Sequence, residues 1–247
     1  MKLLGGPSLT ALAAKLANAH SLLAFDFDGT LAPIVAQRTR AAMRASTRRV
    51  LAGVCERYPV AVISGRARSD VAARVRGLGV KYVVGNHGIE PSAATGAVAR
   101  AVSRAHGFLA RSLASVPGVE LEDKRFSLSL HFRGTKRPAA AHREILAAVR
   151  ALPLAVRVVP GKQVVNVVPA GTPHKGDAVR RLAEAARAER VLYVGDDGTD
   201  EDVFALEEPG LVTVRVARSW QSEADYYLPR QAAVDGLLAA LEAAREG

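Results

Sequence analysis

Short apolar runs alternate with helical patterns along most of the chain. Residues 21–27 form an apolar run that ends in acidic residues, and residues 60–63 and 191–194 form two more runs. Helical patterns at 41–57 and 69–76 follow the first two of these runs. Continuous apolar strands joined by helices are typical of a parallel sheet that is covered on both faces. The pattern therefore predicts an α/β, Rossmann-like core in which polar chemistry gathers beyond the carboxyl ends of the strands.

The middle of the chain follows a different rule. Residues 126–132 alternate strictly between apolar and polar side chains, which predicts a half-exposed strand. A helical pattern at 138–150 and strand-like stretches at 154–159 and 163–168 complete an α+β unit of antiparallel character. We therefore expect a smaller α+β domain inserted into the core. The expected bounds are 1–99 and 173–247 for the core domain and 100–172 for the inserted domain.

A net charge of +10 raises the question of anionic partners. Only seven of the 34 basic residues are lysines, and the arginines are scattered singly along helical stretches such as 138–150 and 178–190. Aromatic residues make up 5% of the chain, which leaves few rings for stacking on bases. A solvated helix face explains this charge better than a nucleic-acid surface. We expect no nucleic-acid partner and keep a basic nucleic-acid-binding protein with inert acid motifs as the alternative from a different class.

The single cysteine, Cys55, excludes an intrachain disulfide and a thiolate metal cluster. It lies in the helical pattern 41–57, where the role of a small buried hydrophobe is expected. Glycine, proline and lysine residues interrupt the apolar stretch near the N-terminus, so we expect an amphipathic helix there and no signal peptide. No apolar stretch approaches the ~18 to 20 residues of a membrane span. We expect a cytoplasmic protein with no membrane partner.

The strongest local signal is the segment Asp26-Phe27-Asp28-Gly29-Thr30, where an apolar strand ends. Alternation puts Asp26 and Asp28 on the same side of the chain, so one can form a covalent bond while the other moves a proton. Two like charges need a counter-ion, and Mg²⁺ suits a carboxylate site and neutralises a phosphate. Gly29 allows a sharp turn of the backbone, and Thr30 offers a hydroxyl to phosphoryl oxygens.

A second acidic segment follows the apolar run 191–194, namely Gly195-Asp196-Asp197-Gly198-Thr199-Asp200-Glu201. So many carboxylates at the end of a buried strand are hard to explain as a solvated surface, and we interpret them as the other half of a metal site. Capping of the next helix explains Thr199 or Asp200 equally well but leaves Asp196 unexplained.

Two further residues fit the handling of a phosphate. Ser64 ends the run 60–63 and, with Gly65-Arg66, offers a hydroxyl and backbone N–H groups to an oxyanion. Lys175 begins a helix, where a cation gains nothing from the helix dipole, and this indicates another partner. Each signal alone is weak, since Ser64 is also an ordinary turn residue and Lys175 an ordinary surface lysine.

These four segments, in this order, resemble the four motifs of the haloacid dehalogenase superfamily of phosphotransferases, and the insert resembles that superfamily's C2 type of cap. The closer resemblance is to the trehalose-6-phosphate phosphatase family and spans about residues 21 to 205. It rests on Asp26-Phe27-Asp28-Gly29-Thr30-Leu31-Ala32-Pro33-Ile34, Ser64-Gly65-Arg66, Asn86-His87-Gly88 and the acidic segment 195–201. In the insert, Leu121-Glu122-Asp123-Lys124 and Leu130-His131-Phe132-Arg133 are also similar to that family.

The resemblance implies a role for each matching residue. Asp26 would be the nucleophile and Asp28 the general acid and base. Mg²⁺ would be held by Asp26, the backbone carbonyl of Asp28 and Asp196, with Asp197 and Asp200 near it. Ser64 and Lys175 would hold the phosphoryl group. Further contacts to the substrate are expected from Gly29, Thr30, Gly65, Arg66 and His87.

The sugar end of the substrate is expected to meet polar residues of the insert. Hydrogen bonds to hydroxyl groups are expected from Glu122, Lys124, His131, Arg133, Lys162 and Asn166, although solvent exposure explains the same polarity. The resemblance departs at Asn166, where the family has Glu. Because an amide donates as well as accepts, this change leaves room for a different glycosyl phosphate.

We therefore expect a Mg²⁺-dependent phosphoric monoester hydrolase of trehalose biosynthesis that converts trehalose 6-phosphate to trehalose and phosphate through an aspartyl-phosphate. The nearest alternative is a phosphatase of the same superfamily for another sugar phosphate, of the glucosyl- or mannosyl-glycerate phosphate type. The expected partner is a small sugar phosphate, and a monomer is favoured although the sequence does not determine the oligomeric state.

Overall fold

The computed structural model describes residues 1–91, 95–161 and 163–245 of the 247-residue chain. The chain divides into two compact units, which we call the core unit (Met1–Gly88 with His174–Gly247) and the inserted unit (Ile89–Pro173). The domain bounds expected from the sequence, with an insert at 100–172, stay a prediction.

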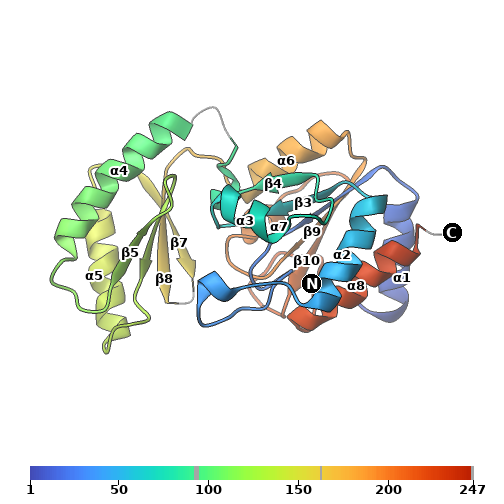
Figure 1. Ribbon diagram of the computed structural model, residues 1–247, viewed down its shortest axis with the longest axis horizontal. Helices are drawn as coiled ribbons and strands as arrows, with labels where there is room; N and C mark the ends of the chain where they lie inside the picture. The colour runs from blue at the N-terminus through green and yellow to red at the C-terminus, as the bar shows by residue number, and fades with distance from the viewer. Residues whose placement is uncertain (92–94, 162, 246–247) are drawn as a thin grey trace. The chain divides into compact units, whose positions relative to one another are not determined.

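A seven-stranded parallel sheet forms the centre of the core unit, with the strand order β1-β11-β10-β9-β2-β3-β4 (Figure 1). Strand β2 (Ser21–Phe25) lies between β9 (Arg190–Gly195) and β3 (Val60–Ile63), and every residue of β2 and β3 is buried. Burial on both faces explains why these strands are continuous apolar runs. The predicted α/β core with a parallel sheet is confirmed. The remaining strands are β1 (Lys2–Leu3), β4 (Tyr82–Val84), β10 (Leu211–Val216) and β11 (Tyr226–Leu228).

Helices cover both faces of this sheet. Leu23 and Phe25 of β2 belong to a hydrophobic cluster with α1 (Gly6–Ala17), α2 (Ala45–Arg57), α3 (Arg68–Arg74) and α8 (Val234–Ala243). The intervening residues Leu22 and Ala24 belong to a second cluster with α6 (Lys175–Ala186) and α7 (Glu201–Phe204). Successive side chains of a strand point to opposite faces of the sheet, so alternate residues of one apolar run pack against the helices on opposite sides. Short 3₁₀ turns occupy Arg38–Arg40, Asn86–Gly88 and Gln231–Ala233.

The inserted unit contains a four-stranded antiparallel sheet in the order β5-β6-β8-β7. Its strands are β5 (Glu120–Asp123), β6 (Leu128–His131), β7 (Val156–Gly161) and β8 (Val164–Pro169). The helices α4 (Thr95–Ser112) and α5 (Pro138–Arg150) share one hydrophobic cluster with Leu128, Leu130, Val165 and Val167 of this sheet. The expected α+β architecture of antiparallel character matches this arrangement.

Part of the arginine excess holds the loops of the core unit. Arg48 donates hydrogen bonds to the carbonyl oxygens of Arg74 and Arg76, and Arg245 donates to that of Arg57 at 2.5 Å. Arg68 donates to the carbonyl of Val83 at 3.0 Å. A planar guanidinium suits such contacts because it presents several donors in a fixed geometry. These arginines therefore have a structural role that requires no anionic partner.

Gly88 provides a test of how tightly the core unit is packed around the end of its 3₁₀ turn. Its φ of 113° is rarely adopted by other residues, and a Cβ at this position would collide with the carbonyl of His174. We expect Gly88→Ala to lower the free energy of unfolding by more than ~2 kcal/mol. Gly77→Ala is the matched control, because Gly77 also has positive φ (77°) but open space around it, and a loss of ~1 kcal/mol is expected there. Equal losses in urea unfolding would contradict the role of the close approach.

Candidate functional site

The chemistry-bearing residues lie where three neighbouring strands of the core sheet end. Asp26 follows β2, Ser64 follows β3, and Asp196 follows β9. The backbone N–H of Asp26 donates to the carbonyl of Val194 at 2.8 Å, which continues the β2 and β9 pairing up to the site. Because β2 lies between β9 and β3 and all three strands are parallel, these residues lie together beyond the carboxyl ends of the strands.

Lys175 links the two acidic segments. Its ammonium lies 2.7 Å from Oδ1 of Asp26 and 2.7 Å from Oδ1 of Asp200, and its side chain is 1% exposed. Burial acts to lower the pKa of an ammonium, but Asp200 and Asp26 outweigh burial and hold the pKa of Lys175 well above its usual value. The first residue of α6 is therefore a buried cation shared by two carboxylates.

Asp200 is saturated with hydrogen bonds. Its Oδ1 accepts from Lys175 and from the hydroxyl of Tyr193 at 2.5 Å. Its Oδ2 accepts from the backbone N–H groups of Asp196 and Asp197 at 2.8 and 2.9 Å. Each oxygen of Asp200 accepts two hydrogen bonds. Asp200 therefore organises the acidic segment 195–201, which we call the acidic loop, rather than offering a free oxygen. The sequence reasoning missed Tyr193, whose only signal was a hydroxyl within an otherwise apolar strand.

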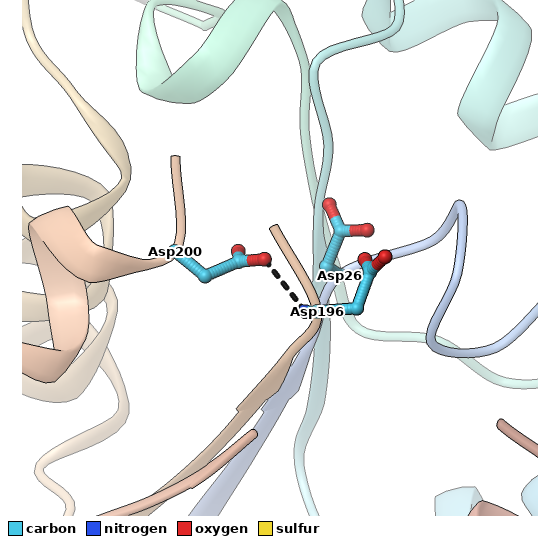
Figure 2. A group of neighbouring side chains, drawn as sticks. All are labelled: Asp26, Asp196 and Asp200. Carbon is cyan, nitrogen blue, oxygen red and sulfur yellow. Dashed lines mark hydrogen bonds between the residues drawn. The ribbon is translucent and has the colours of Figure 1, made fainter. Parts of the chain in front are cut away.

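Asp26 and Asp196 present their carboxyl groups side by side, while Asp200 points at the backbone of Asp196 (Figure 2). Oxygens of these three residues lie within 4.8 Å of one another. Burial, followed by Asp200 and Asp197, raises the pKa of Asp196 to about 8. Burial also raises the pKa of Asp26 well above its usual value, against the opposing charge of Lys175. The protein alone therefore leaves excess negative charge at this point.

The arrangement fits a divalent cation. Oδ1 of Asp196 is buried and has no hydrogen-bond partner among the described residues. The carboxylate of Asp196 occupies the space beside Gly29 that any Cβ at that position would fill. Two neighbouring carboxylates, buried at Asp26 and partly buried at Asp196, with one unsatisfied oxygen are the donor set that Mg²⁺ takes, usually with additional waters or phosphate oxygens.

Asp197 makes a different kind of contact from its neighbour. Its Oδ1 accepts from the backbone N–H and the hydroxyl of Thr199, both at 2.7 Å. Burial acts to raise the pKa of Asp197, but Lys175 and the hydrogen bonds from Thr199 outweigh it and lower that pKa to about 2. Oδ1 of Asp197 therefore shapes the turn of the acidic loop, and the metal ligation expected for Asp197 stays a prediction.

The side chain of Asp28 is held by Arg66. The guanidinium of Arg66 donates to both carboxylate oxygens of Asp28, at 2.5 and 2.7 Å, and donates to Asp70 at 2.8 Å. Arg74 holds the other oxygen of Asp70 at 2.9 Å. Arg66 is thus engaged with carboxylates of the protein, whereas the sequence suggested a substrate contact.

The remaining phosphate-site candidates surround the strand ends. Ser64 is buried and its hydroxyl accepts from the backbone N–H of Arg66 at 3.2 Å. The hydroxyl of Thr30 is buried and has no hydrogen-bond partner in the described part of the chain. The ring of His87 packs directly against Gly65, where any Cβ would collide with it. These positions form the surroundings of Asp26 that an oxyanion would meet.

The inserted unit brings several of the sugar-binding candidates to one face of its sheet. The register pairs Glu122 with Ser129 and Ser129 with Asn166, so these side chains share a face. The hydroxyl of Ser129 donates to Asn166 at 2.6 Å, and the amide of Asn166 donates to the carbonyl of Val159 at 3.3 Å. His131 lies 2.9 Å from Glu122. Lys124 and Arg133 follow the ends of β5 and β6, and Lys162 lies outside the described residues.

The core fold, with a buried lysine and carboxylates at the strand ends, is that of a haloacid-dehalogenase-type protein. Solved structures share it: the C-terminal domain of C. albicans trehalose-6-phosphate phosphatase has a TM-score of 0.80 at 21% identity, covering 95% of this chain and 96% of that one. An Aspergillus fumigatus trehalose-6-phosphate phosphatase has a TM-score of 0.64 at 27% identity, covering 98% and 99%. The family model described as trehalose-phosphatase matches residues 24–231, so the chain belongs to the trehalose-phosphatase family.

Curated relatives agree with this family. The trehalose-phosphate phosphatase of Mycolicibacterium paratuberculosis is 38% identical over 221 residues, which cover 83% of this chain and 56% of that protein. The probable trehalose-phosphate phosphatase 9 of Oryza sativa subsp. japonica is 33% identical over 219 residues, covering 79% and 58%. The chain thus spans little more than half the length of these relatives. Among the described residues, no helix combines the length and the apolar character that crossing a membrane requires.

The raised pKa of Asp196 predicts a pH dependence of folding. Without metal, folding raises this pKa from 3.8 to about 8, so the folded state retains a proton that the unfolded state releases between these values. In EDTA we expect the free energy of unfolding to fall as the pH rises through this window, and to fall less steeply in Asp196→Asn. Added Mg²⁺ should reverse the trend in the wild type because it binds the ionised carboxylate. Equal slopes for the two proteins in urea unfolding would contradict this prediction.

Proposed function

We propose that this chain hydrolyses trehalose 6-phosphate to trehalose and phosphate, with Mg²⁺ as cofactor. The observation that carries the proposal is the buried carboxylate of Asp26, held 2.7 Å from Lys175 and beside the unsatisfied oxygen of Asp196. A carboxylate nucleophile, a cation for the phosphoryl oxygens and a metal-binding oxygen are the requirements of phosphoryl transfer to an aspartate.

In the first half-reaction, an oxygen of Asp26 attacks phosphorus and the bond from phosphorus to the sugar oxygen breaks. Asp28 gives its proton to the departing sugar oxygen, which leaves an aspartyl-phosphate on Asp26. In the second half-reaction, Asp28 takes a proton from water, whose oxygen attacks the phosphorus while the bond from phosphorus to the Asp26 oxygen breaks, which releases phosphate and restores the Asp26 carboxylate. The acid of the first step is thus the base that the second step needs.

The neighbouring residues stabilise the charge that moves through these steps. Lys175, Ser64 and the hydroxyl of Thr30 bind phosphoryl oxygens. Asp26, Asp196 and the backbone carbonyl of Asp28 would hold the Mg²⁺, which would supply charge neutralisation and orientation of the phosphoryl group. Asp200 acts through Lys175 and the loop backbone, because its own oxygens are saturated.

The choice of trehalose 6-phosphate rests on the family and on the names of the relatives, with the inserted unit as the source of sugar contacts. Its sheet face carries Glu122, Ser129, His131 and Asn166, a set of hydrogen-bonding groups suited to sugar hydroxyls. Asn166 keeps a phosphate of another glycoside as the second candidate, since its amide donates where the family has a carboxylate. A cytoplasmic location is part of the proposal and rests on the single cysteine.

Phosphate release from a panel of sugar phosphates tests the reaction and the substrate together. With Mg²⁺ we expect turnover of trehalose 6-phosphate above that of glucose 6-phosphate and of glucosylglycerate phosphate, and with EDTA we expect none. Asp26→Asn should abolish turnover, because an amide is a poor nucleophile, while its cooperative urea transition is retained. Turnover that survives in Asp26→Asn would exclude this residue as the phosphoryl acceptor. A preference for another sugar phosphate of the panel would change the proposed substrate but not the proposed reaction.

The pairing of Arg66 with Asp28 predicts a dependence on the leaving group. Removing Arg66 frees the acid that protonates the sugar oxygen, but an aryl phosphate leaves without a proton. We expect Arg66→Met to lower kcat/KM for the sugar phosphate by ~10²-fold and that for p-nitrophenyl phosphate far less. Arg74→Met is the matched control, because Arg74 contacts Asp70 without contacting Asp28. A parallel loss on both substrates in Arg66→Met would show that Arg66 does not act through proton transfer.

A further inference from the structure

The acidic loop that carries Asp196 accepts hydrogen bonds from a residue on a neighbouring strand, which lies outside the four sequence segments described above. Arg215 lies on β10, directly beside Gly195 of β9 in the parallel register. Its Nη2 donates to the carbonyl of Asp196 at 2.6 Å, and its Nη1 donates to the carbonyl of Asp197 at 3.2 Å. One guanidinium therefore holds two successive carbonyls of the loop, and the fixed fork of the side chain sets their relative orientation.

The opposite edge of the same loop is held by Asp200. The backbone N–H groups of Asp196 and Asp197 donate to Oδ2 of Asp200, whereas their carbonyls accept from Arg215. The N–H groups of Asp196 and Asp197 thus bind a carboxylate, and their C=O groups bind a guanidinium. This arrangement leaves little freedom for the backbone from which the carboxylate of Asp196 extends.

Glu201 keeps Arg215 in place. Its Oε1 lies 2.6 Å from Nη1 of Arg215, and its Oε2 accepts from the hydroxyl of Ser222 at 3.2 Å and the N–H of Glu223 at 3.1 Å. The Arg215 side chain is 14% exposed, and its Nε is buried with no hydrogen-bond partner in the described ranges. The guanidinium is therefore fixed by neighbouring segments and directed at the loop, at the expense of one unsatisfied donor.

We propose that Arg215 is a positioning residue for the metal site, which presets the backbone of Asp196 so that its carboxylate is ready to bind Mg²⁺. The proposal rests on the proposed function for the identity of the site. The contacts that the described residues give Arg215 are to Asp196, Asp197 and Glu201, and none is to Asp26. The effect of Arg215 passes through two peptide groups to the residue that ligates the metal, in the way that outer residues orient metal ligands elsewhere.

Charge and geometry predict opposite outcomes when Arg215 is removed. As a cation close to a cation site, Arg215 repels Mg²⁺, so loss of its charge alone would strengthen metal binding. As the holder of the loop, it keeps Asp196 in place, so loss of its hydrogen bonds weakens metal binding. The sign of the change in affinity therefore separates the two effects without reference to catalysis.

The test is calorimetric titration with Mg²⁺ alone, in the absence of any phosphate ester. We expect Arg215→Met to bind Mg²⁺ ~10- to 100-fold more weakly than the wild type. Arg215→Lys keeps the positive charge but loses the planar pair of donors that holds both carbonyls, so it should also bind Mg²⁺ more weakly. If Arg215→Met does not fold, the Mg²⁺ affinity of Arg215→Lys tests the proposal. Arg218→Met is the matched control, because Arg218 stacks on Trp220 and Tyr227 and makes none of the loop contacts. Its Mg²⁺ affinity should equal that of the wild type.

Activity gives a second readout. Arg215→Met should need correspondingly more Mg²⁺ for half-maximal phosphate release, while kcat at saturating Mg²⁺ returns close to the wild-type value. Wild-type or tighter Mg²⁺ binding in the folded Arg215 variants would overturn the proposal, as would a loss of kcat that no Mg²⁺ concentration restores. If the wild-type protein binds Mg²⁺ but hydrolyses no sugar phosphate, the proposed function is wrong. The positioning role of Arg215 is then judged from the Mg²⁺ affinities alone.

Discussion

The site depends on one buried interaction, the sharing of the Lys175 ammonium between Asp26 and Asp200. Charges are costly to bury, and a lysine with 1% side-chain exposure persists only because two carboxylates lie 2.7 Å from it. The three residues come from α6, the end of β2 and the loop after β9. Their pairing therefore joins the separate strand ends into one site.

Asp200 extends this interaction into the loop that carries the metal-binding oxygen. Four donors reach its two oxygens, and they come from a helix, a strand and the loop backbone. Arg215 completes the frame by holding the carbonyls of the same loop. The acidic segment thus contains two kinds of carboxylate. Among the described residues, Oδ1 of Asp196 has no hydrogen-bond partner, whereas Oδ1 of Asp197 and Oδ2 of Asp200 accept hydrogen bonds from the loop itself.

The two units use their sheets differently. In the core unit, both faces of the sheet are covered by helices, so β2 and β3 are apolar along their length and carboxylates follow where β2 and β9 end. In the inserted unit, one face of an antiparallel sheet packs in the hydrophobic cluster and the register aligns polar side chains such as Ser129 and Asn166 on the other. The core unit therefore gathers its carboxylates at the strand ends, whereas the inserted unit pairs its buried polar groups with one another across neighbouring strands.

The amino-acid sequence by itself determined the architecture and the positions of the acidic residues at the strand ends. Continuous apolar runs predicted the parallel core, strict alternation predicted the antiparallel insert, and acids directly after apolar runs located Asp26 and Asp196. These features are readable because periodicity and strand ends are local properties of the chain. The helix pattern at 138–150 agrees with α5 for the same reason.

Only the tertiary structure decided which polar residue does what. Tyr193 and Arg215 lie inside strand sequences, where a single polar group in an apolar run does not show which partner it has. The sequence placed Arg66 beside the phosphate site, but only the structure showed that its guanidinium pairs with Asp28 and Asp70. The physical reason is that a hydrogen bond depends on a partner's position in space, which the fold sets: Asp28 lies 38 residues from Arg66 and Asp196 lies 19 residues from Arg215 along the chain.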